Sequence, residues 1–358
     1  MEVYEILAIN PGSTSTKIAV FKNAKSIFLK NIKHSSENLK DFKKISDQFH
    51  LRKDIILNEL KQAEIELDKI GAVVGRGGLV KPIPSGVYEV NEAMKADLKD
   101  SPLGEHASNL GGLIADDIAQ SLPNARAFIA DPVVVDEMQE VARIAGHPKF
   151  KRHSIFHALN QKAIARTHAK SQDKEYEELN LIIAHLGGGI SVGAHKKGNV
   201  IDVNNALDGD GPFSPERTGT LPVGQLAKIC FSGDYTLDEV KKMIKGNGGL
   251  VAYLGTNDAY EVEMMVRDNN EKAKLIQDAL SYQVAKEIGA MSCVLKGEVD
   301  AIILTGGIAH NPLLVEYVRN MVQFIAPLHV YPGEDEMKAL SMNGLRVLKG
   351  ETTPKTYK

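Results

Sequence analysis

Cysteine is scarce in this chain. Its 358 residues include only Cys230 and Cys293, each inside an apolar helical pattern. Two cysteines so far apart exclude a disulfide framework, and they predict packed thiols in a protein of a reducing compartment.

Charge of one sign and long apolar runs are missing too. The formal net charge is only −3, which leaves no strong field to attract nucleic acid or an anionic membrane. No apolar stretch is long enough to span a bilayer, and the first residues lack the basic region of a signal peptide. The sequence therefore predicts a cytoplasmic protein whose partners include neither nucleic acid nor a membrane.

Length and an apolar content of 43% are enough for two domains with separate cores. We expect one domain over 1–150 with the C-terminal segment 335–358, and a second over 151–334. Buried strands alternate with amphipathic helices, which predicts an α/β fold. Strands are expected at 6–10, 18–21, 71–75, 127–131, 181–184, 190–194 and 299–304, and helices at 54–69, 105–120, 155–169, 271–296 and 335–348.

A glycine-rich turn between two apolar β runs occurs twice. The first turn follows 6–10 and the second follows 181–184, so that aligning Ala8 with Ala184 gives an offset of 176 residues. Backbone N–H groups left open in such a turn form an anion nest, and hydroxyls add donors. The first turn lacks the Gly-Lys-Ser/Thr ending of a Walker A loop. Two nests facing a cleft would suit the phosphates of a nucleotide.

Two side chains stand out for their positions. Asp131 ends an apolar strand, where a carboxylate is costly without a cation or hydrogen bonds, and with Pro132 behind it a helix cap is the alternative. Arg217 lies in the loop 204–224, which is rich in glycine and proline and long enough to be functional.

His153 and His157 share a helix face, but no third ligand at a zinc spacing accompanies them.

Segments along nearly the whole chain resemble the acetokinase family, within the superfamily of acetate and sugar kinases, Hsp70 and actin. They are 10–17, 75–78, 101–109, 129–133, 152–160, 185–189, 208–219 and 305–311. The resemblance implies two duplicated actin-like ATPase domains, of the ribonuclease H-like kind, with an interdomain cleft. It also implies that the protein binds ATP and Mg²⁺ and forms a homodimer or larger homo-oligomer.

The same resemblance assigns roles to residues. Catalytic roles fall on Asn10, Arg76, Asp131, His157 and Arg217. Asp131 would hold Mg²⁺ through water, and Arg76 and His106 would bind the substrate. Nucleotide binding falls on Gly12, Ser13, Thr14, Ser15, His185, Gly187, Gly188, Gly189, Gly306, Gly307 and Asn311. Considered by themselves, His185 and His195 give no indication of more than a structural role.

The chain departs from acetate kinases at two of these positions. Acetate kinases have a histidine where Arg76 precedes two glycines, so its role rests on bidentate chemistry toward carboxylate or phosphoryl oxygens. They have a glutamate where this chain has His310, and histidine is a poor magnesium ligand. Metal binding is therefore not carried over to His310.

The implied activity is reversible phosphorylation of butyrate and similar short-chain fatty acids by ATP. A carboxylic acid with a pKa of about 4.3 is already a nucleophile at neutral pH, so no general base is required. An acetate or propionate kinase would share every phosphate-binding residue. An Hsp70- or actin-like interaction protein, or a sugar-responsive regulator, is disfavoured because no further module is seen after the helix 335–348 or before the first strand.

Overall fold

A computed structural model describes residues 2–40, 42, 44–102 and 104–358. By packing, the chain divides into two compact units. Unit 1 comprises Met1–Val135 and Asp335–Lys358, and unit 2 comprises Asp136–Glu334. This division differs from the predicted domains only in residues 136–150, which pack with unit 2.

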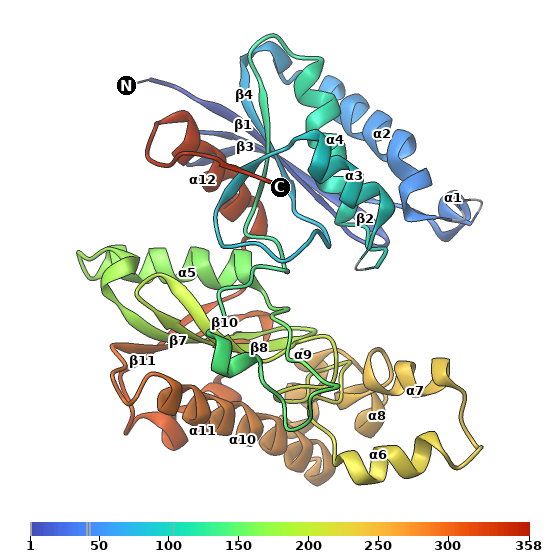
Figure 1. Ribbon diagram of the computed structural model, residues 1–358, viewed down its shortest axis with the longest axis vertical. Helices are drawn as coiled ribbons and strands as arrows, with labels where there is room; N and C mark the ends of the chain where they lie inside the picture. Colours follow the sequence, from blue (N-terminus) through green and yellow to red (C-terminus); the bar gives the residue numbers. More distant parts are fainter. Residues whose placement is uncertain (1, 41, 43, 103) are drawn as a thin grey trace. The chain divides into compact units, whose positions relative to one another are not determined.

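Unit 1 is built on a seven-stranded sheet in the order β12-β5-β6-β4-β1-β2-β3. Figure 1 labels β1 to β4 of this sheet. The strands are β1 (Glu5–Pro11), β2 (Ser15–Lys22), β3 (Lys25–Lys33), β4 (Ile70–Arg76), β5 (Val87–Glu89), β6 (Arg126–Ala130) and β12 (Lys355–Thr356). Every residue of β1 is buried, as in a parallel strand that is covered on both faces.

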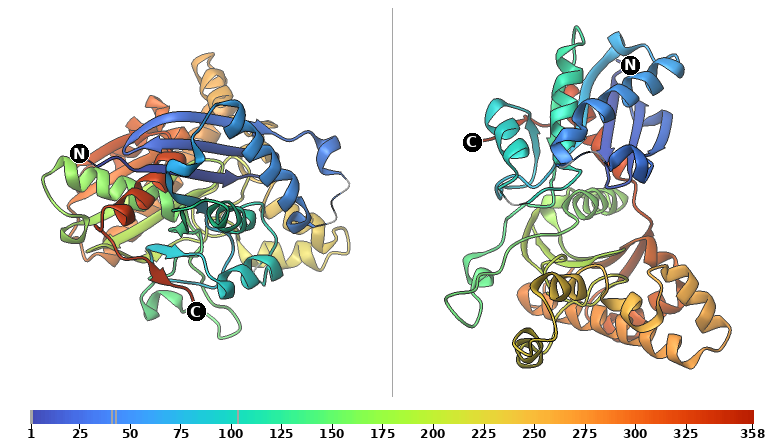
Figure 2. Two further views of the ribbon diagram at one scale, coloured as in Figure 1. Left: turned by 90° about the horizontal axis from the view of Figure 1, so that it is seen from above. Right: turned by 90° about the vertical axis from the view of Figure 1, so that its right-hand side faces the viewer.

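Helices lie on both faces of this sheet. A side chain at Gly75 would collide with the backbone of α4, whereas one at Gly344 of α12 would press on Val74. Neighbouring residues of a strand point to opposite faces, so α4 and α12 lie on opposite faces (Figure 2). The helices of unit 1 are α1 (Ser36–Leu39), η1 (Ile45–Gln48), α2 (Phe49–Gln62), η2 (Leu67–Lys69), α3 (Glu92–Asp100), α4 (Asn109–Gln120) and α12 (Glu336–Leu348).

Unit 2 has a five-stranded sheet in the order β11-β10-β7-β8-β9. One face of β7, with Ile182 and Ala184, packs on α10 and α11, and the other, with Ile183, packs on α5. The strands are β7 (Asn180–Leu186), β8 (Ile190–Lys196), β9 (Asn199–Val203), β10 (Ala301–Gly306) and β11 (Leu328–Pro332). The helices are η3 (Glu140–Arg143), α5 (Ala158–Ser171), η4 (Tyr176–Glu178), α6 (Val223–Cys230), α7 (Leu237–Ile244), α8 (Gly249–Leu254), α9 (Ala259–Arg267), α10 (Glu271–Val294), η5 (Gly307–His310) and α11 (Pro312–Val322).

The two sheets repeat one topology. In unit 1, β1 pairs antiparallel with β2 and parallel with β4, β2 pairs antiparallel with β3, and β4 pairs parallel with β6. In unit 2, β7, β8, β9, β10 and β11 stand in the same relations. The predicted duplicated α/β fold is therefore confirmed.

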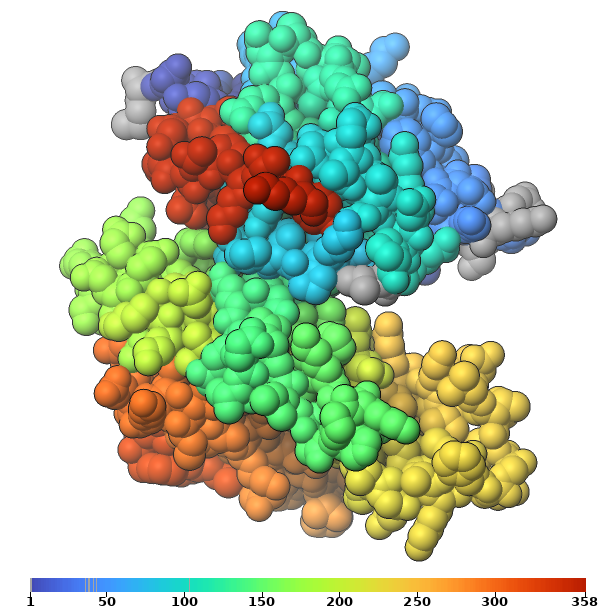
Figure 3. Space-filling view, viewed as in Figure 1, coloured from blue at the N-terminus to red at the C-terminus, as the bar shows by residue number. Residues whose placement is uncertain are grey.

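Two local predictions need correction. Helix α2 begins at Phe49 and ends at Gln62, so it starts before the predicted Asp54. Cys230 and Cys293 are free thiols as expected, but both are exposed, so the prediction that they are packed is wrong. Helix α6, which holds Cys230, has no buried residue, and this part of the chain lies at the surface (yellow in Figure 3).

No helix in the described residues combines the length and the apolar character needed to cross a membrane.

Candidate functional site

In unit 1, three predicted site residues stand where parallel strands end. Asn10 is near the end of β1, Arg76 ends β4, and Asp131 follows β6 directly. The strand register pairs Ile9 with Gly75, and Arg76 with the residue that precedes Asp131. The three therefore share the carboxyl edge of the sheet, where α/β folds commonly bind their ligands.

Asn10 and Arg76 share a partner that the sequence did not reveal. Oε2 of Glu336 accepts hydrogen bonds from Nδ2 of Asn10 at 2.5 Å and from Nη1 of Arg76 at 3.0 Å. The same Nη1 lies 3.4 Å from Oδ1 of Asn10. Glu336 is in the first turn of α12, and only its place at the start of a predicted helix could have drawn attention to it.

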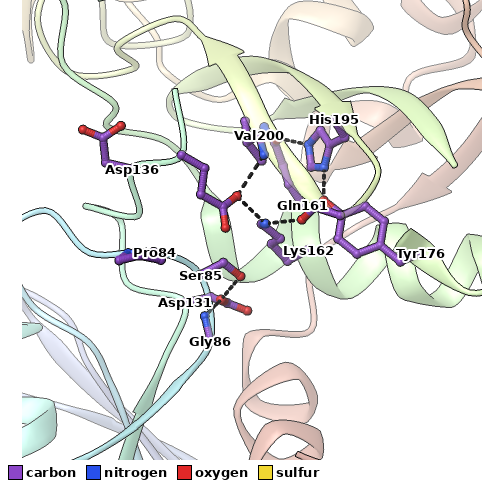
Figure 4. Close-up of polar contacts among 12 residues, drawn as sticks. Pro84, Ser85, Gly86, Asp131, Asp136, Gln161, Lys162, Tyr176, His195 and Val200 are labelled. Atoms are coloured by element: carbon purple, nitrogen blue, oxygen red, sulfur yellow. Dashed lines mark hydrogen bonds and ion pairs between the residues drawn. The ribbon is translucent and has the colours of Figure 1, made fainter. Parts of the chain in front are cut away.

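Asp131 is held by the segment that precedes β5. Its Oδ1 accepts hydrogen bonds from Oγ of Ser85 at 2.7 Å and from the backbone N–H of Gly86 at 2.9 Å (Figure 4). The residue is 2% exposed. The alternative of a helix cap is wrong, because the chain from Pro132 to Val135 forms a turn and no helix.

The carboxylates of unit 1 fit magnesium better than zinc. Within the described part of the chain, no three His, Cys, Asp or Glu side chains are grouped to hold a metal, and so His153 and His157 have no third ligand there. Mg²⁺ typically takes one or two carboxylates and completes its shell with water and phosphate oxygens. Asp131 and Glu336 are donors of that kind.

The first glycine-rich turn has two exposed residues that carry hydroxyl groups. Ser13 and Thr14 are exposed, and the N–H of Gly12 closes the turn by donating to the carbonyl of Ser15 at 2.7 Å. Behind the turn lies Arg52 of α2, which is 1% exposed and which the sequence did not single out. An exposed turn with hydroxyls and a buried cation behind it favours an anion.

In unit 2, Arg217 lies against the second glycine-rich turn. A side chain at Gly189 would collide with the guanidinium of Arg217, so a larger residue there would displace this guanidinium. Nη1 of Arg217 donates to the carbonyl of Ala206 at 2.6 Å, whereas its buried Nε meets no acceptor among the described residues. Burial lowers the pKa of the Arg217 guanidinium from its ordinary value. Oγ of Ser214 donates to the carbonyl of Gly188 at 2.7 Å and ties the loop to the turn.

Gly306 and Gly307, at the end of β10, approach the second glycine-rich turn. Gly306 has φ +90°, and a side chain there would collide with the backbone of Leu186 at the end of β7. Asn311 is buried, caps α11 through Leu313 and Leu314, and donates to Oε1 of Gln277 at 2.9 Å. The adenosine contact of Asn311 and the roles of Gly306 and Gly307 stay predictions.

His157 and His185 stack with ring centroids 3.8 Å apart. Nδ1 of His185 lies 2.8 Å from Oδ1 of Asn160, so this nitrogen carries a proton and donates. Its Nε2 lies 3.4 Å from Oε2 of Glu334. The structure thus brings His157 to the strand that leads into the second turn.

A buried chain of hydrogen bonds runs from Tyr176 to His157. Tyr176 Oη lies 2.6 Å from Nδ1 of His195, whose Nε2 lies 2.8 Å from Oε1 of Gln161 (Figure 4). Nε2 of Gln161 lies 3.0 Å from the carbonyl and 2.9 Å from Oγ of Ser191, which lies 2.9 Å from Nδ1 of His157. His195 is fully buried, and burial holds its pKa well below its usual value.

The donors and acceptors of this chain have one consistent direction. The carbonyl of Ser191 can only accept, so it fixes the amide orientation of Gln161 and makes Oγ of Ser191 an acceptor toward Gln161. The backbone N–H of His157 also donates to Oγ of Ser191 at 3.4 Å, so both lone pairs of Oγ are used and Ser191 donates its hydroxyl proton to Nδ1 of His157. The proton of a neutral His157 is therefore assigned to Nε2.

His106 is exposed, and its Nδ1 lies 2.8 Å from Oγ of Ser108 just before α4. Its role in substrate binding stays a prediction.

Comparison with known proteins identifies relatives. Residues 142–344 match the model of the acetokinase family. "Butyrate kinase 2" of Clostridium acetobutylicum is 56% identical over 355 residues, 99% of this chain and 99% of that protein. "Butyrate kinase 1" of the same organism is 56% identical over 356 residues, 99% of this chain and 100% of that protein.

Solved structures share the fold. Acetate kinase of Porphyromonas gingivalis superposes with a TM-score of 0.81 at 19% identity, covering 96% of this chain and 100% of that structure. A propionate kinase of Francisella tularensis gives a TM-score of 0.76 at 20% identity, covering 95% and 98%.

Proposed function

The chain belongs to the acetokinase family, and on that premise we propose that it transfers the γ-phosphoryl group of ATP to butyrate and similar short-chain fatty acids. The product is an acyl phosphate. The observation that carries the choice of butyrate is the 56% identity, over nearly the whole chain, to two butyrate kinases. An acetate or propionate kinase remains the alternative because it would use the same phosphate-binding residues.

For this reaction the protein has mainly to orient the substrates and to stabilise negative charge. A carboxylate attacks phosphorus directly, so no base has to remove a proton. Arg76 would orient the carboxylate with a bidentate guanidinium, and Arg217 would stabilise negative charge that spreads over the γ-phosphoryl oxygens. The acyl phosphate bond is at least as energetic as that of ATP, so the enzyme would also make ATP from it.

The remaining residues have roles in binding the nucleotide. The two glycine-rich turns would bind phosphate oxygens through backbone N–H groups and hydroxyls. Asn10 and Nε2–H of His157 would donate hydrogen bonds to the transferred group. Mg²⁺, held by Asp131 through water with Glu336 as a further carboxylate, would neutralise phosphate charge.

We also propose a cytoplasmic homodimer or larger homo-oligomer, from the family membership and from the absence of a membrane-spanning helix in the described residues.

The direct test is a hydroxamate assay of acyl phosphate formation. We expect kcat/KM with ATP to be higher for butyrate, isobutyrate or valerate than for acetate, because each methylene in an apolar pocket contributes about 1 kcal/mol. Acetate as good as butyrate would assign the chain to the acetate kinase branch. Absence of hydroxamate with every acid, from folded protein with ATP and Mg²⁺, would reject the proposed function.

A further inference from the structure

Arg52 is a long cationic side chain that is almost completely buried. It lies on α2, is 1% exposed, and has its guanidinium behind the first glycine-rich turn. Buried arginines normally pair with a carboxylate, because an isolated buried charge is costly. Within the described part of the chain, Arg52 forms no such ion pair and meets only neutral acceptors.

These acceptors are mainly the carbonyls of the turn. Nη1 of Arg52 donates to the carbonyl of Gly12 at 2.8 Å and to that of Ser15 at 3.2 Å. Its Nη2 donates to the carbonyl of Ser13 at 3.2 Å. The guanidinium also contacts Oγ1 of Thr16 at 3.0 Å and Oε1 of Gln48 at 2.8 Å and 3.0 Å.

The backbone carbonyls and the backbone N–H groups of the turn differ in their hydrogen bonding. The fourth carbonyl, that of Thr14, accepts from the N–H of His34 at 2.8 Å. All four carbonyls from Gly12 to Ser15 are therefore bonded to protein donors. By contrast, no described residue accepts a hydrogen bond from the N–H of Ser13 or Thr14, both of which are exposed.

The buried environment keeps the charge unbalanced. His34 lies 2.8 Å from Oγ1 of Thr16, and its pKa is lowered by burial and then by the charge of Arg52. Arginine stays protonated in proteins, so the cation persists. An anion on the outer side of the turn would be the counter-charge that Arg52 lacks.

We propose that Arg52 is a positioning residue for the phosphates of the nucleotide. It draws the carbonyls of Gly12, Ser13 and Ser15 away from the ligand, leaves N–H groups facing it, and supplies positive charge from behind. This inference rests on the proposed function, since it takes ATP as the ligand. It assigns Arg52 to nucleotide affinity and gives it no contact with the carboxylate substrate.

The substitution Gln48→Glu tests the role of the Arg52 charge while it keeps the shape of the side chain at position 48. The substitution keeps the acceptor for Arg52 but adds a carboxylate that neutralises it, so every hydrogen bond of a purely structural Arg52 survives. We expect Tm to be unchanged or higher, while calorimetric Kd for ATP, and for tripolyphosphate alone, weakens about tenfold, equivalent to 1.4 kcal/mol. KM for butyrate should stay within about twofold.

Arg52→Ala provides the second test, with Lys53→Met as the matched control. Lys53 is the next residue of α2 and pairs with Asp117 at 2.9 Å. We expect Arg52→Ala to weaken ATP binding and to recover it when guanidinium ion is added at millimolar concentration, whereas Lys53→Met should bind ATP normally. Arg52→Lys should recover little, because an ammonium cannot reach three carbonyls in one plane.

The outcomes separate this inference from the proposed function. Wild-type ATP affinity in Gln48→Glu would overturn the charge role of Arg52, even if Arg52→Ala failed to fold. Equal losses for ATP and butyrate would also overturn it. A wild-type protein that binds ATP but forms no acyl hydroxamate would reject the proposed function and leave the calorimetric comparison decisive for Arg52.

Discussion

Arg217 is the single residue from which we expect the largest effect on the chemical step. Its guanidinium packs on Gly189 and has a buried Nε without an acceptor among the described residues. A supplied arginine in phosphoryl transfer is typically worth about 10³-fold in kcat. We therefore predict that Arg217→Ala lowers kcat by about this factor, and that Arg217→Lys recovers little because lysine lacks the planar fork.

The measurement is kcat and KM with ATP and butyrate varied separately. A loss confined to KM for butyrate would show that Arg217 only holds the carboxylate, and Arg76 would then become the candidate for the transition state.

A substitution at Asp131 tests the proposed magnesium site, again through a single residue. Its φ of +38° and its hydrogen bonds to Ser85 and Gly86 suit asparagine as well as aspartate. Asp131→Asn thus removes the charge and keeps the shape. We predict a large fall in kcat and a higher Mg²⁺ requirement, with circular dichroism and Tm unchanged. Asp117→Asn, in the half-buried ion pair with Lys53, is the control. Near-normal activity of Asp131→Asn would place the metal elsewhere.

Between elements, the hydrogen-bond chain from Tyr176 to His157 joins η4, β8 and α5. Ser191→Ala removes the donor that keeps the proton of His157 on Nε2. We predict a fall in kcat of about tenfold, the effect of losing about one hydrogen bond to the transferred group. We also predict little change in KM for ATP and a shift of the ¹⁵N signals of His157 toward the other tautomer. Tyr176→Phe, at the far end, should have a smaller effect of the same kind.

A purely structural chain would behave differently. Ser191→Ala would then lower Tm and leave both the pH profile of kcat and the tautomer of His157 as they were.

Local sequence was enough to predict most of the elements. Buried strands such as β4 and β7 are short apolar runs. The duplication was predictable because a glycine-rich turn follows the first strand of each unit. The family membership was predictable as well, because its motifs lie in order along the chain.

Residues that act through distant partners were not predictable. Arg52 lies 40 residues from Gly12, and Glu336 lies 326 residues from Asn10, so no local pattern joins them. Cys230 was expected to be packed because its helix is apolar, yet α6 buries none of its residues. An apolar pattern identifies a helix but does not say whether anything covers it.

For the whole molecule, Glu287 should make stability depend on pH. Burial raises its pKa to about 7, with Asp210 adding to the shift. The folded state then holds a proton that the unfolded state releases near pH 4.5, so the free energy of unfolding falls as pH rises from about 4.5 to about 7. We predict that Glu287→Gln is more stable than the unchanged protein above pH 7, by up to about 3 kcal/mol, and equally stable near pH 4.

Denaturation of both proteins across this pH range is the measurement, with Glu316→Gln, at an exposed ion pair of α11, as the control. A stability difference that does not vary with pH would mean that the glutamine acts through packing.

Unit 1 is made of two stretches of chain separated by the whole of unit 2. On the ribosome, β1 to β6 therefore emerge long before α12, the helix that packs on β1, β2 and β4. Until then one face of that sheet lacks its cover, while the contiguous unit 2 can fold as soon as it is made. The sheet of unit 1 is thus translated before unit 2 but is covered only after it. In the interval its uncovered apolar strands are the part of the nascent protein that we expect a chaperone to bind.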